Sequence, residues 1–514
     1  MNWKKYKTLD SAAKRDEAYY IIGLDVGNDS SAIAFYNVAD NLPETIDLSG
    51  GYGKPSIPTV MQYVPETKEW VFGEYAILNK GVGTVFTSLT ERLGRFDHID
   101  VDGRSLSVAS VLAMFVKELL GNVKNINPRA EIVGIVASVP AYFSEQAHEE
   151  FRKVFKLAGY EKELIALIPD RECVLAHNYR TTPEKEEHAL IIDLGSRELR
   201  GGLYRVNNDK DGVVATSVSS VFDDEISMNA LNNDVSDLFE SFLEKGAATE
   251  AILREHLPAF TYQHKDILFQ KNIRTKPLKL YYNFVYPPVQ HTLANDRVEG
   301  LVKPYVQRFN KFINDVLEKN LYEKKIQPDR VDTVLCVGGG FDMLWAKEAV
   351  GGIFNKKDGD NKIKFFKNPK LITAEGAALI AAHRLGLTET NLTLEDKHQL
   401  TGDIGFADGD NFLTLVERNG FWWQKYPSKL ILLNHPVDGD VDLHLEERTP
   451  DREGRKLATL HLNGLSKRPK GVTRLEVKLN FNTNEELIVN IKDQGFGELF
   501  PKTDYEREFA VKLG

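Results

Sequence analysis

Two segments of the chain repeat one order of apolar run, small polar turn and second apolar run. The first, at residues 20–37, reads YYIIGLDVGNDSSAIAFY, and the second, at residues 189–206, reads ALIIDLGSRELRGGLYRV. Apolar runs on either side of a glycine-bearing turn are typical of a strand, a tight turn and a strand. Because the same unit occurs twice, we predict two lobes with related cores and a cleft that receives both turns.

Strands alternate with helices between and after these units. A β-branched run ends at Pro140, and a helical pattern follows it as far as Gly159, a typical C-terminal cap. A third strand runs from Asp332 into Gly338, and a helix of small residues ends at Gly386. The helix before Gly159 has one apolar face, formed by Ala147, Phe151, Val154, Phe155 and Ala158. This alternation predicts an α/β domain.

The pattern changes at Gly386. Before it, residues 223–326 are rich in helical patterns and are expected to form the outer part of the second lobe. After it, a short polar stretch is typical of a linker, and the remainder alternates apolar and polar residues between Asp-Gly and Asn-Gly turns, as in a small antiparallel sandwich. The expected division is an extension at 1–17, a two-lobed domain at 18–388, a linker at 389–399 and a β-sandwich at 400–514.

Two clusters in the predicted sandwich have more than one interpretation. The aromatic cluster FWW at residues 421–423 is expected in the sandwich core rather than along a ligand groove. A run of basic residues is expected on a solvated turn and strand face rather than against an anionic partner. This run consists of Lys467, Arg468, Lys470 and Arg474.

Composition excludes several classes of function. A chain of 514 residues exceeds one ordinary hydrophobic core, so two or three domains are expected, and its net charge of −10 argues against a nucleic-acid partner. Its first twenty residues are charged throughout, unlike a signal peptide, and no apolar run approaches a bilayer span, so we expect no membrane partner. Cys173 and Cys336 lie far apart in segments predicted to be buried, which excludes a disulfide framework and favours the cytoplasm.

The first repeated turn is suited to hold an anion. Gly27 lets the backbone fold back, so that N–H groups and the short side chains of Asn28 and Asp29 point at a phosphate. Asp25, at the end of the strand, is placed to hold a hydrated magnesium ion. The plainer interpretation is a β-hairpin in which Asp25 is a turn residue.

The second turn repeats the acid and the glycine as Asp193 and Gly195, and Asp170 ends the preceding apolar run. Three carboxylates around one cleft would hold a metal through water and orient a nucleophilic water toward a terminal phosphate. Each carboxylate alone is explained as a solvated or capping residue. The glycine run at 338–340 either lets the backbone approach an adenosine group or forms a tight strand-to-helix turn with positive φ.

These motifs resemble those of the heat-shock protein 70 chaperones, within the actin and sugar-kinase ATPase superfamily. The family's first phosphate motif is matched by IGLDVGNDSSAIAFY, its connecting motif by IVASVPAYFSEQAHEEFRKVFKLAGY, its second phosphate motif by IIDLGSRELRGGLYRV, and its adenosine motif and helix by VLCVGGGFDML and NPKLITAEGAALIAA. The end of the family's peptide-binding β-domain resembles HLNGLSKRPKGVTRLEVKLNFNTNEELIVNIKDQGFGE. The resemblance implies an actin-like, ribonuclease H-like ATPase domain of two lobes followed by a small all-β sandwich.

The resemblance also implies roles for individual residues. Asp25 and Asp193 would hold Mg²⁺ through water, and Asp170 stands where the family has a catalytic glutamate, so these three are the expected catalytic residues. The β and γ phosphates of ATP, or the phosphates of ADP, would contact Gly27, Asn28, Asp29, Gly195, Ser196 and Arg197. The adenosine would face Gly338, Gly339 and Gly340.

Several residues depart from the family pattern. After the second Asp-Leu-Gly, two glycines and a threonine are replaced by Ser196, Arg197 and Glu198, of which Arg197 suits phosphate and Glu198 repels it. Thr90 stands where the family has a catalytic lysine, and Arg92 would substitute for it only if the register shifted by two residues. Because phosphoryl transfer depends on positioning and charge neutralisation, we expect slow or absent ATP hydrolysis.

Three further segments bear on this comparison. Pro277 interrupts NIRTKPLKLYYN, which aligns with the adenine-lining helix of the family. Leu392 and Leu394 resemble the leucine-bearing linker that couples the two domains of the family. The family continues into a helical lid, whereas this sequence ends at Gly514 just after the sandwich, so rapid exchange of bound peptide is expected.

Three functions are compatible with these features. The leading one is an ATP-dependent, chaperone-like protein in which nucleotide state changes the affinity of the β-domain for unfolded or extended polypeptide, with co-chaperones as further partners. The second is a pseudo-ATPase scaffold with a dedicated protein partner and little or no hydrolysis, favoured by Thr90, Ser196, Arg197 and Glu198. The third is a sugar or carboxylate kinase of the same superfamily, against which the appended β-domain counts.

Overall fold

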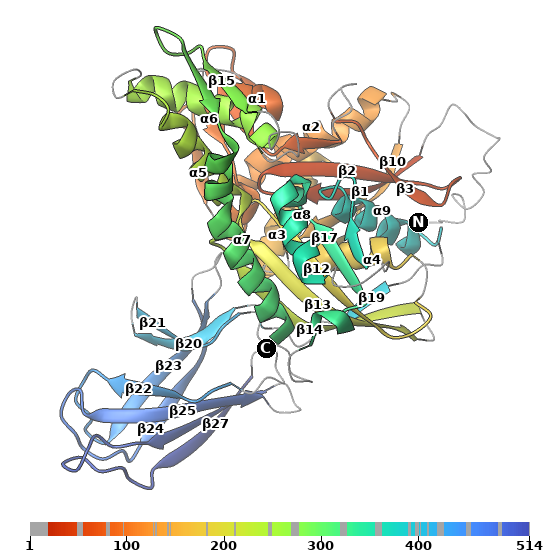
Figure 1. Cartoon of the computed structure of the whole chain (residues 1–514). Coiled ribbons are helices and arrows are strands. Elements are labelled where there is room, and N and C mark those ends of the chain that lie inside the picture. The colour runs from red at the N-terminus through yellow and green to blue at the C-terminus, as the bar shows by residue number, and fades with distance from the viewer. Residues whose placement is uncertain are drawn as a thin grey trace. The chain divides into compact units, whose positions relative to one another are not determined.

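The computed structural model divides the chain into two units, which Figure 1 shows in colour from red to blue. One comprises Met1–Ala141 with His148–Glu395, and the other comprises Tyr142–Ala147 with Asp396–Gly514. The structure describes residues 19–48, 55–78, 83–95, 97–126, 128, 131–140, 143, 145–180, 183–209, 212–244, 249–268, 277–318, 326–354, 362–388, 392–395, 400, 402–408, 411–418, 426–448, 454–481 and 486–512.

The first lobe contains a mixed sheet that positions the first turn. Its strands are β1 (Tyr19–Val26), β2 (Ser30–Asn37), β3 (Leu42–Thr45), β4 (Ser56–Pro58), β10 (Glu131–Val139) and β11 (Leu164–Pro169). Their order is β11-β10-β1-β2-β3, with β4 beside β2. β1 runs antiparallel to β2 and parallel to β10. Residues 21–24 of β1 are all buried, because both faces of this sheet are covered.

The second lobe repeats this arrangement. Its strands are β12 (Glu187–Leu194), β13 (Leu199–Asp209), β14 (Gly212–Asp223), β17 (Thr333–Val337), β18 (Ile363–Phe365) and β19 (Leu392–Glu395). Their order is β18-β17-β12-β13-β14-β19. The hairpin β12-β13 corresponds to β1-β2, and the parallel strands β17 and β18 correspond to β10 and β11. The predicted repetition of strand, turn and strand is therefore confirmed.

Three helices follow strands of the two sheets: α3 (Glu145–Ala158) follows β10, α4 (Asp170–Asn178) follows β11, and α9 (Ile372–Arg384) follows β18. All five residues of the predicted apolar face of α3 are buried, and Gly159 has a φ of +91° at its C-terminal end. α9 packs against α4 and β1. The approach is close, since a Cβ at Gly376 would lie 1.8 Å from the carbonyl oxygen of Cys173.

Residues 223–326 form the helix-rich part of the second lobe, with α5 (Met228–Glu240), α6 (Glu250–Leu268) and α7 (Asn295–Glu318). The segment aligned with an adenine-lining helix is not helical where the structure describes it. It forms β15 (Leu278–Tyr282), which runs antiparallel to β16 (Val289–Leu293). Leu280 and Tyr282 are buried while their neighbours are more exposed, which is the period-two pattern of a strand.

The remaining elements of the first unit are short apart from one helix. They are α1 (Glu74–Leu78), α2 (Val108–Ile126), α8 (Leu344–Phe354), β5 (Met61–Val64), β6 (Glu69–Phe72), β7 (Thr84–Phe86), β8 (His98–Val101), β9 (Arg104–Ser107) and the 3₁₀ helices η2 (Thr90–Arg92), η4 (Pro328–Arg330) and η5 (Gly339–Asp342). Among the helices of the described residues, none is both long and apolar enough to cross a membrane.

The second unit contains two antiparallel sheets. Their strands are β20 (Asp403–Asp408), β21 (Asn411–Val416), β22 (Lys429–Leu433), β23 (Asp440–Arg448), β24 (Arg455–Asn463), β25 (Thr473–Phe481), β26 (Glu486–Asp493) and β27 (Glu506–Lys512). The strand orders are β21-β20-β23-β24 and β22-β25-β26-β27. Alternate apolar residues of both sheets share one core, which is the predicted sandwich. The predicted turns at Gly439 and Gly464 have φ values of +109° and +86°.

One prediction for the sandwich is wrong. Arg468 was expected on a solvated face, but its side chain is 3% exposed and donates two hydrogen bonds of 2.6 Å to the carboxylate of Asp493. A bidentate pair satisfies a buried guanidinium, which explains how a basic residue enters this core. Lys467 and Lys470 are exposed, as expected. The aromatic cluster at 421–423 lies outside the described residues.

Candidate functional site

The first glycine turn carries an aspartate whose two oxygens are both engaged. Asp25 lies opposite Ser138 in the parallel pairing of β1 with β10, and the hydroxyl of Ser138 donates to Oδ1 of Asp25 at 2.7 Å. Nζ of Lys370, just before α9, donates to Oδ2 of Asp25 at 2.6 Å. A Cβ at Gly27 would lie 2.9 Å from the same Nζ. A lysine ammonium therefore lies against the turn that the sequence assigns to phosphate.

The second glycine turn has an arginine in the corresponding place. Asp193 faces Arg200 in the antiparallel pairing of β12 with β13. Nη2 of Arg200 donates to Oδ2 of Asp193 and Nη1 donates to Oδ2 of Asp170, both at 2.6 Å. Oε1 of Glu198, a buried residue, lies 3.8 Å from Nε of Arg200. One guanidinium thus joins two of the three carboxylates that the sequence predicts to share a cleft.

The two turns share one electrostatic environment. Burial alone would lower the pKa of Lys370, but the charge of Asp25, together with those of Asp193 and Asp29, raises that pKa above its usual value. Burial raises the pKa of Asp193, and the charge of Arg200 opposes that rise. The charges of carboxylates from both turns therefore act on Lys370.

Other predicted phosphate-binding residues are held by the protein itself. The side-chain oxygen of Asn28 accepts a hydrogen bond of 2.9 Å from the backbone N–H of Glu91. Oε2 of Glu91 lies 3.6 Å from Nε of Arg197, so Glu91 connects the segments that carry the two turns. Glu91 therefore links Asn28 of the first turn to Arg197 of the second.

Backbone groups of both turns also make internal hydrogen bonds. The carbonyl oxygen of Asp29 accepts from the N–H of Thr59 at 2.8 Å. The carbonyl oxygen of Ser196 accepts from the N–H of Asn229 at 2.9 Å, near the beginning of α5. The N–H of Gly195 donates to the carbonyl oxygen of Glu198 at 3.1 Å, which closes the second turn. These bonds fix the shape of both turns.

The glycine run after β17 forms a tight turn. Gly338 has a φ of +87°, and a Cβ there would lie 2.4 Å from Oδ1 of Asp193. A Cβ at Gly340 would lie 2.2 Å from the side chain of Leu194. Gly339 has no atom within 4 Å of such a Cβ. The need for glycine at Gly338 and Gly340 follows from the protein's own packing, and contact with adenosine stays a prediction.

Neither residue considered in place of a catalytic lysine supplies a cation to this cluster. Thr90 is 1% exposed, and its hydroxyl has no hydrogen-bond partner among the described residues. Arg92 pairs with Asp97, with Nε and Oδ2 3.0 Å apart. The cations of the cluster are instead Lys370 and Arg200, which the sequence analysis missed. Counting back from the hairpin turn would have placed Arg200 opposite Asp193, whereas Lys370 has no local signal because 345 residues separate it from Asp25.

The predicted magnesium site does not fit these residues. Both oxygens of Asp25 are engaged, one of them by a cation, and Asp193 is engaged by Arg200. Two unit charges of the same sign about 4 Å apart repel by roughly 4 kcal/mol at an effective dielectric of about 20. A divalent ion between these carboxylates would therefore have to displace Lys370 from Asp25 and Arg200 from Asp193. Over the described part of the chain, no group of three or more His, Cys, Asp or Glu residues is placed to hold a metal ion.

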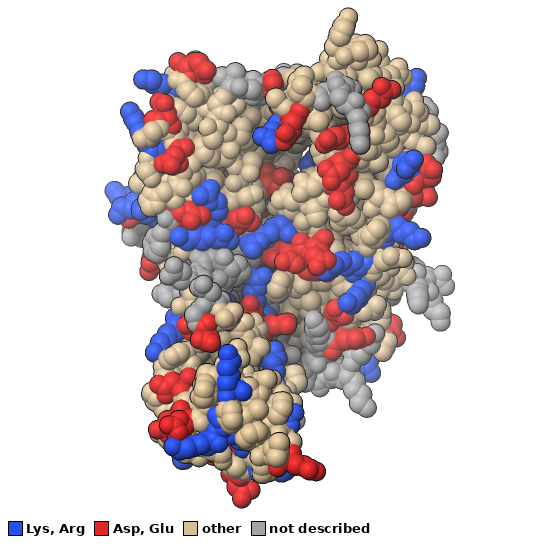
Figure 2. All heavy atoms as spheres, turned by 90° about the vertical axis from the view of Figure 1, so that its left-hand side faces the viewer, with Lys and Arg blue, Asp and Glu red and all other residues tan. Residues whose placement is uncertain are grey.

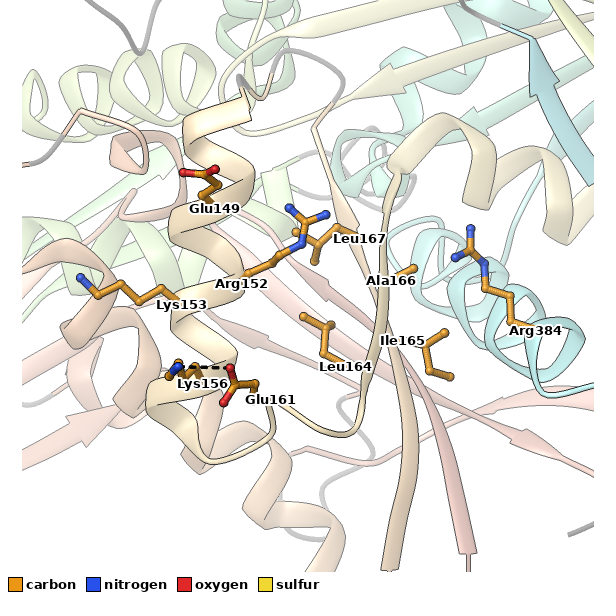
Figure 3. Close-up of a pocket in the computed structure, with 10 residues that line it drawn as sticks. All are labelled: Glu149, Arg152, Lys153, Lys156, Glu161, Leu164, Ile165, Ala166, Leu167 and Arg384. Carbon is orange, nitrogen blue, oxygen red and sulfur yellow. Dashed lines mark ion pairs between the residues drawn. The ribbon is translucent and has the colours of Figure 1, made fainter. Parts of the chain in front are cut away.

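A hollow of about 570 Å³ lies between α3, β11 and the end of α9. Figure 3 shows the side chain of Arg152 extending from α3 toward β11, with Arg384 on the far side of that strand. Its wall also includes Lys153 and Lys156, and Nζ of Lys156 lies 3.2 Å from Oε1 of Glu161. The lining shares no residue with either glycine turn.

On the face shown in Figure 2, acidic and basic side chains are interspersed.

Two sheets of matching strand order, each with an aspartate and a glycine turn, define an actin-like domain of two lobes, here combined with a β-sandwich. The chain belongs to the Hsp70 family, since the family described as "Hsp70 protein" matches residues 90–499. It is 24% identical over 500 residues to "Chaperone protein DnaK" of Mycoplasmoides gallisepticum, covering 93% of this chain and 79% of the relative. It is 23% identical, with the same coverage, to "Chaperone protein DnaK" of Thermosipho africanus.

Proposed function

We propose that this protein is a chaperone that binds unfolded or extended polypeptide with its β-sandwich and couples that binding to ATP or ADP at the two glycine turns. The observation that carries the proposal is β19. This strand lies in the predicted linker, between the two-lobed domain and the sandwich, and pairs in parallel with residues 213–216 of β14. A linker that is a strand of the second-lobe sheet is suited to respond to changes in that sheet.

Side-chain packing supports the role of β19. Leu392 and Leu394 are half-buried and pack against a cluster that includes Val174 and Leu175 of α4. Thr393, between them, is exposed. β19 is therefore held by alternate leucines, and its docking depends on the positions of α4 and the sheet.

The two elements that contact β19, α4 and the second-lobe sheet, both carry residues of the charged cluster. α4 begins at Asp170, and the sheet carries Asp193 and Arg200 on neighbouring strands. Arg200 joins Asp170 to Asp193 directly. A nucleotide that changes these ion pairs would change the relative positions of α4 and β12, and with them the docking of β19.

The sandwich offers a surface for an extended chain. β22 is an edge strand in the described part of its sheet, and edge strands have unpaired backbone groups that bind a further strand. Leu430 and Leu432 are 61% and 52% exposed on one face of β22. Apolar side chains beside an open edge are suited to an extended, apolar segment of an unfolded polypeptide.

The proposal is tested by the affinity of an extended, fluorescently labelled peptide for the protein without nucleotide, with ADP and with ATP. Coupling free energies of typical size predict at least about a fivefold difference between two of these states. Equal affinities in all three states, with nucleotide binding shown by calorimetry, would contradict the coupling. Absence of nucleotide binding at millimolar concentration would contradict the nucleotide part.

A pseudo-ATPase scaffold with a dedicated protein partner is the second candidate. The pairing of Arg200 with both Asp170 and Asp193 favours it, because these carboxylates are then not available to position a nucleophilic water. ATP turnover by the wild type and by Asp193→Ala separates the two functions. Equal background rates would support the scaffold, and hydrolysis that is lost in the variant would eliminate it.

The proposal includes a cytoplasmic location and co-chaperones as further partners. Cys173 and Cys336 are buried free thiols, which supports a reducing compartment.

A further inference from the structure

We propose that the hollow between α3, β11 and the end of α9 is a docking groove for an acidic, extended segment of a partner protein, which adds to the first-lobe sheet as a strand beside β11 (Figure 3). The groove shares no residue with the two glycine turns or with β22. This partner surface is therefore separate from the proposed sites for nucleotide and unfolded polypeptide, and goes beyond the proposed function.

The groove follows the open edge of a sheet. In the described part of the first-lobe sheet, β11 pairs with β10 alone. Four consecutive residues of β11, 164–167, line the groove. Consecutive residues of a strand point to opposite faces of its sheet, so a hollow that all four line runs along the edge of the strand. Edge strands have backbone N–H and C=O groups with which a further strand pairs.

The floor of the groove is apolar and half-buried. Leu164, Ile165, Ala166 and Leu167 all have intermediate exposure, whereas residues 135–139 of the neighbouring β10 are buried. The difference follows from position, because β10 has a strand on either side and β11 has one only on one side. Apolar side chains along an open edge favour a partner segment that brings apolar residues of its own.

The walls of the groove are rich in basic side chains. Glu149, Arg152, Lys153 and Lys156 of α3 recur at the three- and four-residue spacing of one helix face, so one stripe of α3 borders the groove. Figure 3 shows Arg384, at the end of α9, on the far side of β11. Cations therefore lie on both sides of the edge strand.

The charged lining is net positive, with four basic and two acidic side chains, in a chain whose net charge is −10. Of the two acids, Glu161 is paired with Lys156. Glu172 acts on Arg384 from outside the lining, but burial raises the pKa of Glu172 to about 7, so it is only partly charged at neutral pH. Arg152 is exposed and has no ion-pair partner within the described residues, so its donors are available to a carboxylate. Charge complementarity therefore selects an acidic partner segment.

An acidic strand makes use of all three features of the groove. Its backbone pairs with β11, its carboxylates meet the basic stripe of α3, and apolar residues at alternate positions cover the apolar floor. A compact anion such as phosphate would use the cations alone. The combination of edge, floor and walls thus favours an extended polypeptide.

The test is the binding of the full chain to a short, fluorescently labelled peptide of alternating glutamate and valine, measured by anisotropy. One comparison peptide has lysine in place of glutamate, and another has proline in place of valine, which removes backbone N–H donors. We expect only the glutamate–valine peptide to bind, and its binding to protect the amides of residues 164–167 from hydrogen exchange. Equal binding of the proline peptide would show a site for anions only and would overturn the proposal. Binding without added protection at 164–167 would also overturn it.

Charge reversal on α3 provides the matching variant. Arg152→Glu with Lys156→Glu is expected to weaken peptide binding by at least about fivefold, because two exposed attractive contacts become repulsive. Both side chains are exposed, so the fold is expected to be retained. Lys117→Glu with Lys303→Glu makes the same change in net charge at exposed positions of α2 and α7, and should leave the affinity unchanged. Wild-type affinity in the α3 variant would overturn the proposal.

A variant of the sandwich separates this groove from the proposed site for unfolded polypeptide. Leu432→Asp, on the exposed face of β22, is expected to leave binding of the glutamate–valine peptide unchanged. Loss of binding in Leu432→Asp but not in the α3 variant would place the peptide on the sandwich. That result would overturn the docking groove and leave the proposed function intact.

Discussion

At the scale of single residues, the pair of Arg468 and Asp493 is the most buried ion pair of the second unit's described residues, with side chains 3% and 1% exposed. Asp493 also accepts hydrogen bonds from the N–H of Gly495 and from the N–H and hydroxyl of Thr503. Burial alone would raise the pKa of Asp493, but the charge of Arg468 and these donors lower that pKa to about 2. This carboxylate holds together the segments that follow β24 and β26.

Asp493→Asn is expected to destabilise the second unit by about 3 kcal/mol at neutral pH, because Arg468 remains buried without its counter-charge. The folded-state pKa is depressed, so the contribution of Asp493 is present above about pH 4 and is lost as the pH falls through about 2. Urea unfolding of both proteins between pH 7 and about pH 2 measures this. Asp438→Asn, at the exposed pair with Lys467, is the control and should leave the midpoint unchanged.

Glu172, in α4, has a raised pKa, whereas the pKa of Asp493 is lowered. Burial raises the pKa of Glu172 to about 7, against the charges of Arg384 and Arg171. Its contribution to stability is therefore present below about pH 4.5 and is lost as the pH rises through about 7. The free energy of unfolding of Glu172→Gln should therefore rise by roughly 2 kcal/mol relative to that of the wild type as the pH goes from 5 to 8. Denaturant midpoints at the two pH values check this, and a constant difference would contradict it.

The sequence predicts the carboxylates of the site better than its cations. Asp25 and Asp193 follow apolar strands in a repeated unit, so local pattern suffices to bring them to matching turns. Lys370 reaches Asp25 only through the packing of α9 on β1, which no local pattern contains. The same applies to Arg468, whose partner Asp493 lies on another strand.

At the scale of elements, β19 is the feature with the clearest consequence for function. Leu394→Asp is expected to abolish the effect of nucleotide on peptide affinity, because a charged side chain would not pack against α4 and the sheet. Peptide affinity with and without nucleotide measures this. Thr393→Asp is the matched control, since Thr393 is exposed on the same strand. An unchanged nucleotide effect in Leu394→Asp would show that β19 is not the coupling element.

The sequence predicts well the helices and strands that have a strong periodic pattern of apolar residues. It does not predict strands that form only because they pair with residues far away in the sequence. The hairpins β1-β2 and β12-β13 and the helix α3 follow from local apolar patterns. Residues 392–395 look like linker because a single short strand has little local signal, and their strand character depends on β14. Residues 278–282 are a strand because they pair with β16, although the family resemblance suggests a helix.

At the scale of the whole molecule, the second-lobe sheet carries both Asp193 with Arg200 of the charged cluster and β19 of the predicted linker. The family membership establishes the chaperone class, and the repeated sheets position both turns. In its acidic cluster, Lys370 pairs with Asp25, and Arg200 pairs with Asp170 and Asp193. The central claim is that nucleotide at this cluster changes the docking of β19.

Amide hydrogen exchange at residues 392–395 tests this claim most directly, since these amides report the pairing of β19 with β14. Exchange is compared without nucleotide, with ADP and with ATP, at concentrations that saturate the protein by calorimetry. Protection at 392–395 is expected to differ by about fivefold or more between two of these states. Saturating nucleotide that leaves the exchange of these amides unchanged would contradict it.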